Sequence, residues 1–218
     1  MSEKSAIATA PVAPAAFPEA AATLLLPGPA GVLETITDVP QPEHARAGTV
    51  VICHPHPLQG GTMHNKVVTM IERGLRELGL RTVRFNFRGT GESSGEHDEG
   101  RGETLDLLAV AEWVQRVRPG DALWLAGFSF GAYVALLAAR HLPVKQMVSI
   151  APPAGRWDFS AVLSPDCPWL VVQGEDDDVV EPQAVFDWIA AMPEPPQLGG
   201  CFALTMSPMF LNGVSARM

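Results

Sequence analysis

The segment LWLAGFSFGAYVALLAAR, residues 123–140, constrains the fold more than any other part of the chain. It begins as a run of large apolar residues, passes through a turn in which Gly127 and Gly131 flank Ser129, and continues with residues that favour a helix. This pattern predicts a strand over 121–129 and a helix over 130–140. It therefore places Ser129 in a tight turn between a strand and a helix.

Strand-like and helix-like patterns alternate along the rest of the chain. Two apolar runs around a Pro-Gly turn over 23–39 predict a hairpin. The sequence further predicts strands over 48–54, 81–87, 144–150 and 169–175, and helices over 65–80, 102–117 (with Thr104 as a possible N-cap) and 181–192. This alternation is typical of an α/β fold, a mostly parallel sheet with helices on both faces. Ligands bind at the carboxyl ends of such strands, so the residues that follow each strand are candidates for a site.

Composition and charge narrow the classes of function. The chain has 218 residues, 47% of them hydrophobic, which is enough for one domain with one core. Its net charge of −9 repels phosphate backbones and anionic lipid, so we expect neither nucleic-acid nor membrane binding. The three cysteines, Cys53, Cys167 and Cys201, form neither a disulfide framework nor a Cys-x-x-Cys pair. These features favour a cytoplasmic protein.

The first 22 residues are rich in alanine and proline. A secretory signal needs a positive start and an unbroken apolar core, but here Glu3 stands beside Lys4 and prolines interrupt the apolar run. No later run reaches the ~18 apolar residues that a membrane helix needs. We therefore expect residues 1–22 to be a disordered tail and residues 23–218 to form the domain.

The turn at Ser129 matches the pattern G-x-S-x-G, a nucleophile elbow when a strand precedes it and a helix follows. In an elbow the serine has strained backbone angles, and neighbouring chains leave room only for glycine at Gly127 and Gly131. The N-terminus of the following helix favours negative charge that develops at the serine. Three fixed positions in five also occur by chance, but the flanking strand and helix favour Ser129 as a nucleophile.

The loop HPHPLQGGTMHN follows the predicted strand over 48–54. An elbow serine needs two backbone N–H groups that bind an oxyanion, and one comes from the next residue, Phe130. The second is expected from this loop, where His56 is the candidate because the prolines on both sides of it have no N–H. Alternatively, His54, His56 and His64 could bind a metal. No nearby acidic or cysteine ligand completes that set, so we expect no metal.

Two polar loops follow later strands. RGTGESSGEHDEG, residues 88–100, has a glycine spacing one residue longer than that of a dinucleotide-binding loop, which favours a positioning loop at the rim of the site. GEDDDVV, residues 174–180, places acidic side chains at the end of a later strand. An acid that follows the serine along the chain at such a position can orient a histidine. The same residues, Glu175–Asp178, are also typical of a solvated acidic turn.

Five motifs carry a resemblance to a known family. They are CHPHPLQGGTMHNKVVTM, VRFNFRGTGESSG, LWLAGFSFGAYV, SIAPPAGRWDF and VVQGEDDDVV. In these motifs the chain resembles the α/β-hydrolases, and more narrowly a family of small bacterial serine hydrolases without a lid domain, from about Thr23 to about Pro196. The resemblance implies a single α/β-hydrolase domain and esterase-like hydrolysis with no cofactor. It implies Ser129 as nucleophile and Asp177 as triad acid, since the family acid stands three residues after the strand-end glycine, here Gly174.

The expected absence of a lid also follows from the chain. Lids in this fold usually lie between the sixth and seventh strands, and here only residues 151–168 separate the two. That segment is too short for a cap domain. We expect an open, shallow site that takes a small-molecule ester.

The catalytic histidine of the family is missing. The family places it in a His-Phe-Phe segment after the eighth strand, followed by a final helix, whereas this sequence has no histidine after His141. Met209-Phe210 stands about where His-Phe is expected, and the usual last helix is absent. His141 cannot replace it, because it lies roughly 18 Å from Ser129 along the predicted helix, at ~1.5 Å per residue.

The remaining histidines near the predicted site are poor substitutes. His97 is expected on a flexible rim loop, and His54 and His56 lie on the oxyanion side of the serine. The sequence therefore predicts no good base for Ser129. Two functions remain: a serine esterase whose activity is doubtful because the triad histidine is absent, or a non-catalytic module that binds a small molecule or a protein on the same scaffold.

The segment from about residue 197 is atypical for the family. Gly199-Gly200 weakens a strand over 198–204, and Pro208 and Gly213 break a helix over 205–218. We therefore expect an incomplete C-terminal strand and helix. Apolar surface on the seventh strand and on the predicted helix over 181–192 would then be uncovered and would favour self-association.

Overall fold

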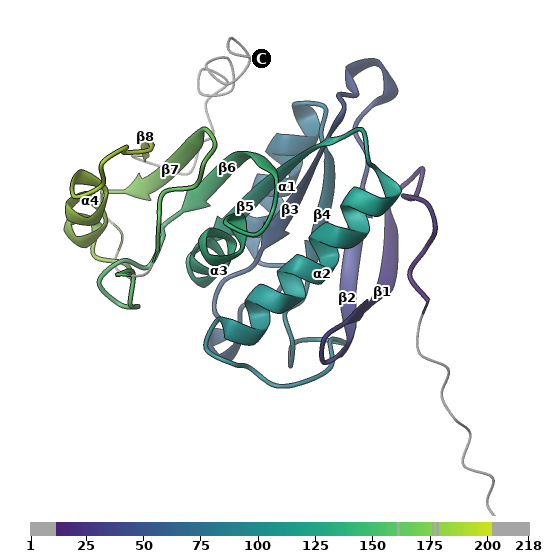
Figure 1. Cartoon of the computed structure of the whole chain (residues 1–218), viewed down its shortest axis with the longest axis horizontal. Helices are drawn as coiled ribbons and strands as arrows, with labels where there is room; N and C mark the ends of the chain where they lie inside the picture. The colour runs from purple at the N-terminus through teal and green to yellow at the C-terminus, as the bar shows by residue number, and fades with distance from the viewer. Residues whose placement is uncertain (1–11, 161, 176, 178, 202–218) are drawn as a thin grey trace, which may run out of the picture.

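The structure, a computed structural model, describes residues 12–160, 162–175, 177 and 179–201. Within these residues it has eight strands and four α-helices (Figure 1). The strands are β1 (Ala22–Gly28), β2 (Gly31–Asp38), β3 (Gly48–Cys53), β4 (Arg81–Phe85), β5 (Ala122–Phe128), β6 (Val144–Ile150), β7 (Trp169–Gly174) and β8 (Gln197–Cys201). The helices are α1 (Lys66–Glu77), α2 (Arg101–Val117), α3 (Phe130–Ala139) and α4 (Pro182–Ala190).

All eight strands belong to one sheet with the order β1-β2-β4-β3-β5-β6-β7-β8. β2 pairs antiparallel with β1 and with β4, and every other neighbouring pair is parallel. α2 and α3 lie in front of the sheet in Figure 1 and α1 lies behind it. The mostly parallel α/β fold with helices on both faces, predicted from the sequence, is confirmed.

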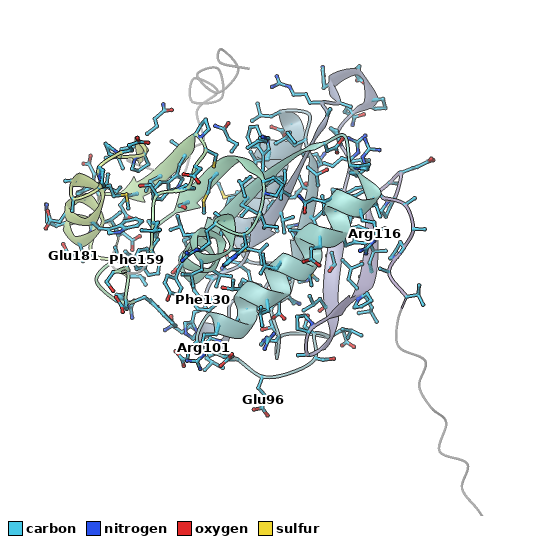
Figure 2. The ribbon with its side chains drawn as sticks, viewed as in Figure 1. Glu96, Arg101, Arg116, Phe130, Phe159 and Glu181 are labelled. Carbon is cyan, nitrogen blue, oxygen red and sulfur yellow. The ribbon has the colours of Figure 1, made fainter. Side chains whose placement is uncertain are left out.

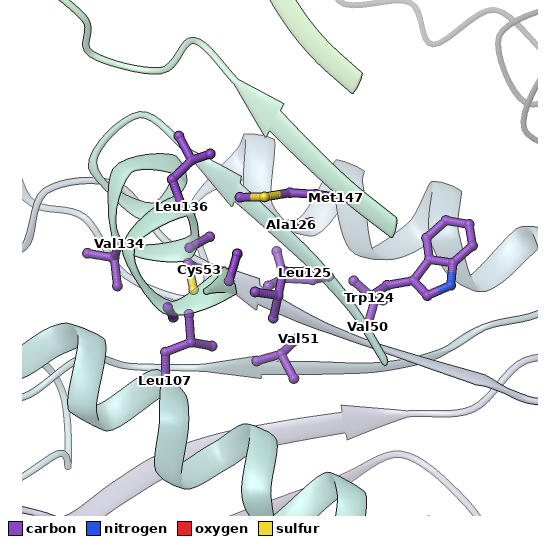
Figure 3. Packing of buried hydrophobic residues seen from close by; sticks show 14 of the residues in the cluster. Val50, Val51, Cys53, Leu107, Trp124, Leu125, Ala126, Val134, Leu136 and Met147 are labelled. Atoms are coloured by element: carbon purple, nitrogen blue, oxygen red, sulfur yellow. The ribbon is translucent and has the colours of Figure 1, made fainter. Parts of the chain in front are cut away.

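The core forms where strand side chains alternate between the two faces of the sheet. Val51 pairs in register with Leu125, and Val50 pairs with Trp124. Figure 3 shows Leu107 of α2 close to Val51 in this core, and both side chains are fully buried. Because β3 and β5 are buried on both faces, the turns at their carboxyl ends are held on a rigid scaffold.

The start of α2 differs from the sequence-based expectation. The helix begins after Gly100, which has a φ of 90°, and Thr104 lies inside the first turn, where its hydroxyl donates to the Gly100 carbonyl oxygen at 2.6 Å. Thr104 as N-cap was therefore wrong. The N-cap residue is Gly100, and the carboxylate of Glu103, the third residue of the helix, reaches back to it: Glu103 Oε2 accepts a hydrogen bond from the Gly100 N–H at 2.8 Å.

The packed part of the chain begins before residue 23. Phe17 is buried and stacks on Trp113 of α2 with 5.7 Å between ring centroids. The Trp113 indole N–H donates to the Pro14 carbonyl oxygen at 3.0 Å. Residues 1–22 were expected to form a disordered tail, but the part of it from Pro14 to Phe17 is docked on α2. Residues 1–11 lie outside the described residues.

A strand forms at the C-terminal side where the sequence predicts only a weak one. β8 pairs with β7 in register from Leu170↔Gln197 to Gly174↔Cys201, and so covers the edge of β7. Val185 and Ile189 of α4 are buried, while Leu198 of β8 is 46% exposed. The predicted incomplete last helix falls on residues 202–218, outside the described residues. No described helix combines the length and the hydropathy that crossing a bilayer requires.

Candidate active site

Ser129 sits in a strained turn between β5 and α3. Its backbone angles are φ 52° and ψ −121°, a conformation that side chains other than glycine rarely adopt. The Ser129 N–H donates to the Ile150 carbonyl oxygen of β6 at 2.8 Å, and the Ser129 carbonyl accepts from the Ala132 N–H at 2.8 Å. The predicted strained elbow is confirmed, and these bonds hold it between the sheet and the helix.

The two glycines of the turn are required by close backbone contacts. A Cβ atom on Gly127 would overlap the backbone of Gly131, and a Cβ on Gly131 would overlap the backbone of Cys53 and His54 at the end of β3. Neither obstacle is a movable side chain. The spacing G-x-S-x-G is therefore dictated by how closely β3, β5 and α3 approach one another.

Two backbone N–H groups lie near the serine and are candidates for binding an oxyanion. Phe130 is the first residue of α3, and His56 precedes a short 3₁₀ helix, Pro57–Gln59. Their rings pack together with 5.0 Å between centroids, which brings the end of β3 to the elbow. In the described part of the chain neither N–H donates to another protein group. Both are available as oxyanion donors, and that role stays a prediction.

The His56 ring has one nitrogen occupied. Its Nδ1 accepts a hydrogen bond from the Leu58 N–H at 3.2 Å, which places the ring proton on Nε2. Burial lowers the pKa of His56, and the neighbouring His97 lowers it further. At neutral pH the ring is therefore uncharged and presents a donor at Nε2, and it is not suited to remove a proton through that atom.

His54 is a structural residue. It is fully buried, its Nε2 accepts from the Phe87 N–H at 3.0 Å, and its Nδ1 lies 2.6 Å from the Pro55 carbonyl oxygen. Burial lowers its pKa to about 4. Both nitrogens are engaged, so His54 does not offer a metal ligand alongside His56 and His64. Among the described residues, no three His, Cys, Asp or Glu side chains are placed to hold a metal ion.

The sequence suggested that His97 lies on a flexible rim loop, but its side chain is packed inward rather than free. Its side chain is only 7% exposed and lies against the rings of His56 and Phe130, at 4.7 and 5.5 Å between centroids. Its Nδ1 is 2.7 Å from Oε1 of Glu103, a fully buried carboxylate in the first turn of α2. Glu103 was not among the site residues predicted from the sequence. The signal available was an acidic residue six positions after a histidine, at the predicted start of a helix.

The loop over 88–100, which carries His97, is fixed to α2 by a bidentate ion pair. Arg88 contacts Asp106 through Nε at 3.0 Å and Nη2 at 2.8 Å, and the Arg88 backbone N–H also donates to Asp106 at 3.0 Å. Hydrogen bonding to Asp106 raises the pKa of Arg88. The role of this loop in positioning a substrate at the rim of the site stays a prediction.

Asp177 lies in the turn after β7. Its Oδ1 accepts from the N–H groups of Val179 and Val180 at 2.8 and 2.9 Å, and its Oδ2 lies 3.3 Å from Nε2 of Gln173, which donates to it. β5, β6 and β7 are parallel neighbours, so the turns of Ser129 and Asp177 share the carboxyl edge of the sheet. Asp176 and Asp178 lie outside the described residues. Asp177 as triad acid, rather than as part of a solvated turn, stays a prediction.

Aromatic side chains from the segment between β6 and β7 pack beside the elbow. Trp157 lies 5.1 Å from the Phe130 ring and 5.5 Å from the His56 ring, and Phe159 lies 5.3 Å from the Tyr133 ring. Figure 2 shows Phe159 and Phe130 on the same side of the molecule. Residues 151–160 and 162–168 contain no helix, so this described part of the segment forms no cap domain over the elbow.

Comparison with known proteins agrees with this geometry. A family model described as the α/β hydrolase fold matches residues 48–162. That match spans more than half of the chain and includes β3, the elbow and the turn after β6. The chain belongs to the α/β-hydrolase family.

Similar solved structures indicate to which group within the family the chain belongs. The protein XC6422 from Xanthomonas campestris, described as an α/β serine hydrolase without lid, is 54% identical, with 85% of each chain covered and a TM-score of 0.82. An α/β serine hydrolase homologue from Coxiella burnetii is 43% identical, with 85% of this chain and 89% of that chain covered and a TM-score of 0.82. This chain is thus a small lidless α/β-hydrolase.

One curated relative, the protein RP471 of Rickettsia prowazekii, is 36% identical over 148 residues. The match covers 66% of this chain and 62% of the relative, so the chain spans less than two thirds of that relative's length.

Proposed function

We propose that the protein is a serine hydrolase of the esterase type that acts on small acyl esters. The observation that carries the proposal is the strained Ser129, with φ 52°, held at the end of β5 beside N–H groups of His56 and Phe130 that have no acceptor among the described residues. Strain of this kind persists only where the surrounding structure enforces it, and it is typical of catalytic sites. The likeness to the lidless serine hydrolase of Xanthomonas campestris supports the same reaction.

The reaction is acyl transfer through Ser129. The Ser129 oxygen attacks the ester carbonyl carbon, and the oxyanion that forms accepts hydrogen bonds from the Phe130 and His56 N–H groups. The C–O bond to the alcohol then breaks, and the alcohol leaves after it gains a proton. Water hydrolyses the acyl-serine to the acid and free serine. No cofactor takes part, and the open edge of the sheet suits a small ester.

The site lacks a histidine in the triad position that could act as the base for Ser129. In the 218 residues no histidine follows His141, and Asp177 has its Oδ1 occupied by backbone N–H groups. A site with the serine and its oxyanion donors but without the triad histidine keeps only a fraction of its turnover. The expected loss is on the order of 10⁴–10⁶ in kcat.

A second candidate function is a non-catalytic binding module. The Asp177 contacts favour it, because the carboxylate is held by its own turn and by Gln173 without an imidazole. In that case the elbow and the aromatic side chains beside it bind a small molecule or a protein segment without covalent chemistry. We expect such a protein to act in the cytoplasm, as we do the esterase.

A fluorophosphonate probe separates the two functions. It reacts only with an activated serine, so an esterase-type site gives slow labelling of Ser129 that Ser129→Ala abolishes. Ser160→Ala, which removes an exposed serine, serves as the matched control and leaves labelling unchanged. Hydrolysis of p-nitrophenyl acetate is expected near background.

Complete resistance of Ser129 to the probe, in a folded protein, favours the binding module. Rapid hydrolysis that depends on Ser129 contradicts the expected weakness of the base.

A further inference from the structure

A base for Ser129 needs a nitrogen lone pair that no other group occupies. His54 has a partner at each nitrogen, the Phe87 N–H and the Pro55 carbonyl. His56 accepts at Nδ1 from the Leu58 N–H, so its Nε2 carries the proton. Neither side chain presents a free lone pair at the carboxyl edge of the sheet.

His97 differs from both. Glu103 Oε1 lies 2.7 Å from its Nδ1, and although the contact is too oblique to count as a regular hydrogen bond, the carboxylate favours a proton on that nitrogen. The lone pair is then on Nε2, which is buried and has no hydrogen-bond partner among the described residues. The nearest charged group is the Glu99 carboxylate, at 3.7 Å. An acid on Nδ1 with an unpaired Nε2 is the arrangement of the acid–histidine half of a catalytic triad.

Glu103 is well placed to orient the His97 ring. Its side chain is fully buried, its Oε1 accepts from the Asp98 N–H at 2.9 Å, and its Oε2 accepts from the Gly100 N–H at 2.8 Å. These bonds fix the carboxylate on the first turn of α2. The helix itself is fixed to the same loop by the pair of Arg88 and Asp106.

The His97 ring is also close to the elbow. It lies 5.5 Å from the ring of Phe130, the residue after Ser129, and 4.7 Å from the ring of His56. Figure 2 shows Phe130 and Arg101, the first residues of α3 and α2, at the same end of the molecule. The ionisable groups around His97 are Glu99 and Glu103 from its own loop and α2, and His56 from the loop after β3.

We propose that His97, oriented by Glu103, is the base that activates Ser129 in this chain, an inference that rests on the proposed function. The Ser129 hydroxyl proton passes to Nε2 of His97 as the serine oxygen bonds to the acyl carbon. The imidazolium pairs with Glu103 and returns its proton to the leaving alcohol. Contacts of this kind often tighten only when substrate is bound. Glu103 acts through His97 and is a positioning residue.

The test measures the rate of Ser129 labelling by a fluorophosphonate between about pH 5 and 9. During labelling the Ser129 oxygen bonds to phosphorus, the P–F bond breaks, fluoride leaves with the bonding electrons, and His97 takes the serine proton. For His97→Gln we expect labelling to slow on the order of 10²-fold, the usual contribution of a general base. The histidine inflection in the pH profile should also disappear. His64→Gln, an exposed histidine of the loop after β3, is the matched control and keeps both the rate and the inflection.

Two further readouts keep the proposal falsifiable. Glu103→Gln should slow labelling less than His97→Gln and shift the inflection, and circular dichroism shows whether each variant is folded. If a variant does not fold, ¹⁵N NMR of the unaltered protein reports the His97 tautomer directly, with a proton expected on Nδ1 and none on Nε2.

The opposite tautomer, or unchanged labelling in folded His97→Gln, overturns the role of His97 and leaves the proposed function standing. No labelling of Ser129 in the unaltered protein overturns both.

Discussion

The backbone of Ser129 keeps an unfavourable conformation that its neighbours enforce. The φ of 52° and ψ of −121° suit glycine, and a Cβ atom at this position costs about 1–3 kcal/mol. The bonds to Ile150 and Ala132 hold the turn in place. A residue kept there despite this cost is consistent with selection for its hydroxyl.

Replacing Ser129 by glycine should therefore stabilise the protein. Ser129→Gly relieves the strain but adds backbone freedom to the unfolded chain, so we expect a net gain of roughly 1 kcal/mol over Ser129→Ala, which keeps the Cβ. Urea unfolding of the two variants measures the difference. Equal stabilities would show that the turn is not strained in solution.

His54 couples folding to pH. Its pKa is lowered to about 4 by burial, whereas an unfolded histidine titrates near 6.5. Between these two values the unfolded chain binds a proton that the folded chain does not. The free energy of unfolding therefore decreases as the pH falls through this range, and the decrease is complete only below about pH 4.

We expect His54 alone to remove on the order of 3 kcal/mol of stability between about pH 6.5 and pH 4. Urea midpoints at several pH values measure the loss, and NMR of the His54 ring shows whether it titrates. His64→Gln should retain the same pH dependence, since that side chain is exposed. A His54 ring that titrates near pH 6.5 in the folded protein would contradict the assignment.

At the scale of elements, the loop over 88–100 and α2 behave as one unit. The buried Asp106 joins them by accepting three hydrogen bonds from Arg88, two from its side chain and one from its backbone. Glu103 adds the contacts that cap the helix and orient His97. The rim of the site is thus built by a helix start rather than by a free loop.

Removing Asp106, the buried partner of Arg88, should lower the stability of the fold strongly. Asp106→Ala leaves the Arg88 guanidinium unpaired in a mostly buried site, and we expect a loss of roughly 3–5 kcal/mol in the free energy of unfolding. Asp98→Ala, which breaks the exposed pair with Arg101, is the control and should have no measurable effect. Equal effects of both changes on thermal unfolding would show that the loop and α2 are not coupled.

At the scale of the whole molecule, the C-terminal side of the sheet carries exposed apolar surface among the residues that the structure describes. β8 covers the edge of β7, but Leu198 remains 46% exposed and α4 buries only Val185 and Ile189 among its residues. Apolar surface of this kind favours self-association. The sequence that follows β8 also lacks the histidine that would complete the triad.

A replacement of residues 202–218 by a segment with His-Phe-Phe and a closing helix should raise both stability and turnover. The helix covers apolar surface, and the histidine supplies the third triad member, so p-nitrophenyl acetate hydrolysis should rise by several powers of ten. A matched tail with Ala-Phe-Phe should raise stability to the same extent, while turnover stays at the level of the unaltered protein. Equal turnover with both tails would contradict the role of the grafted histidine.

Local patterns along the sequence determined the elements and the elbow. Strand and helix periodicity placed β3 to β7 and α1 to α4 within a few residues, and the spacing of Gly127, Ser129 and Gly131 predicted the strained turn that the structure has. These signals work because buried strands, amphipathic helices and tight turns each require particular residues at short range.

The environment of the histidines was decided only by the tertiary structure. Nothing local distinguishes the buried His97 from an exposed one, because its burial comes from His56, Phe130 and Glu103, which three separate segments bring together. The docking of Phe17 on Trp113 and the formation of β8 despite Gly199-Gly200 have the same origin. In each case a long-range contact outweighs the local preference of the chain, since packing against a preformed sheet contributes more than intrinsic propensity.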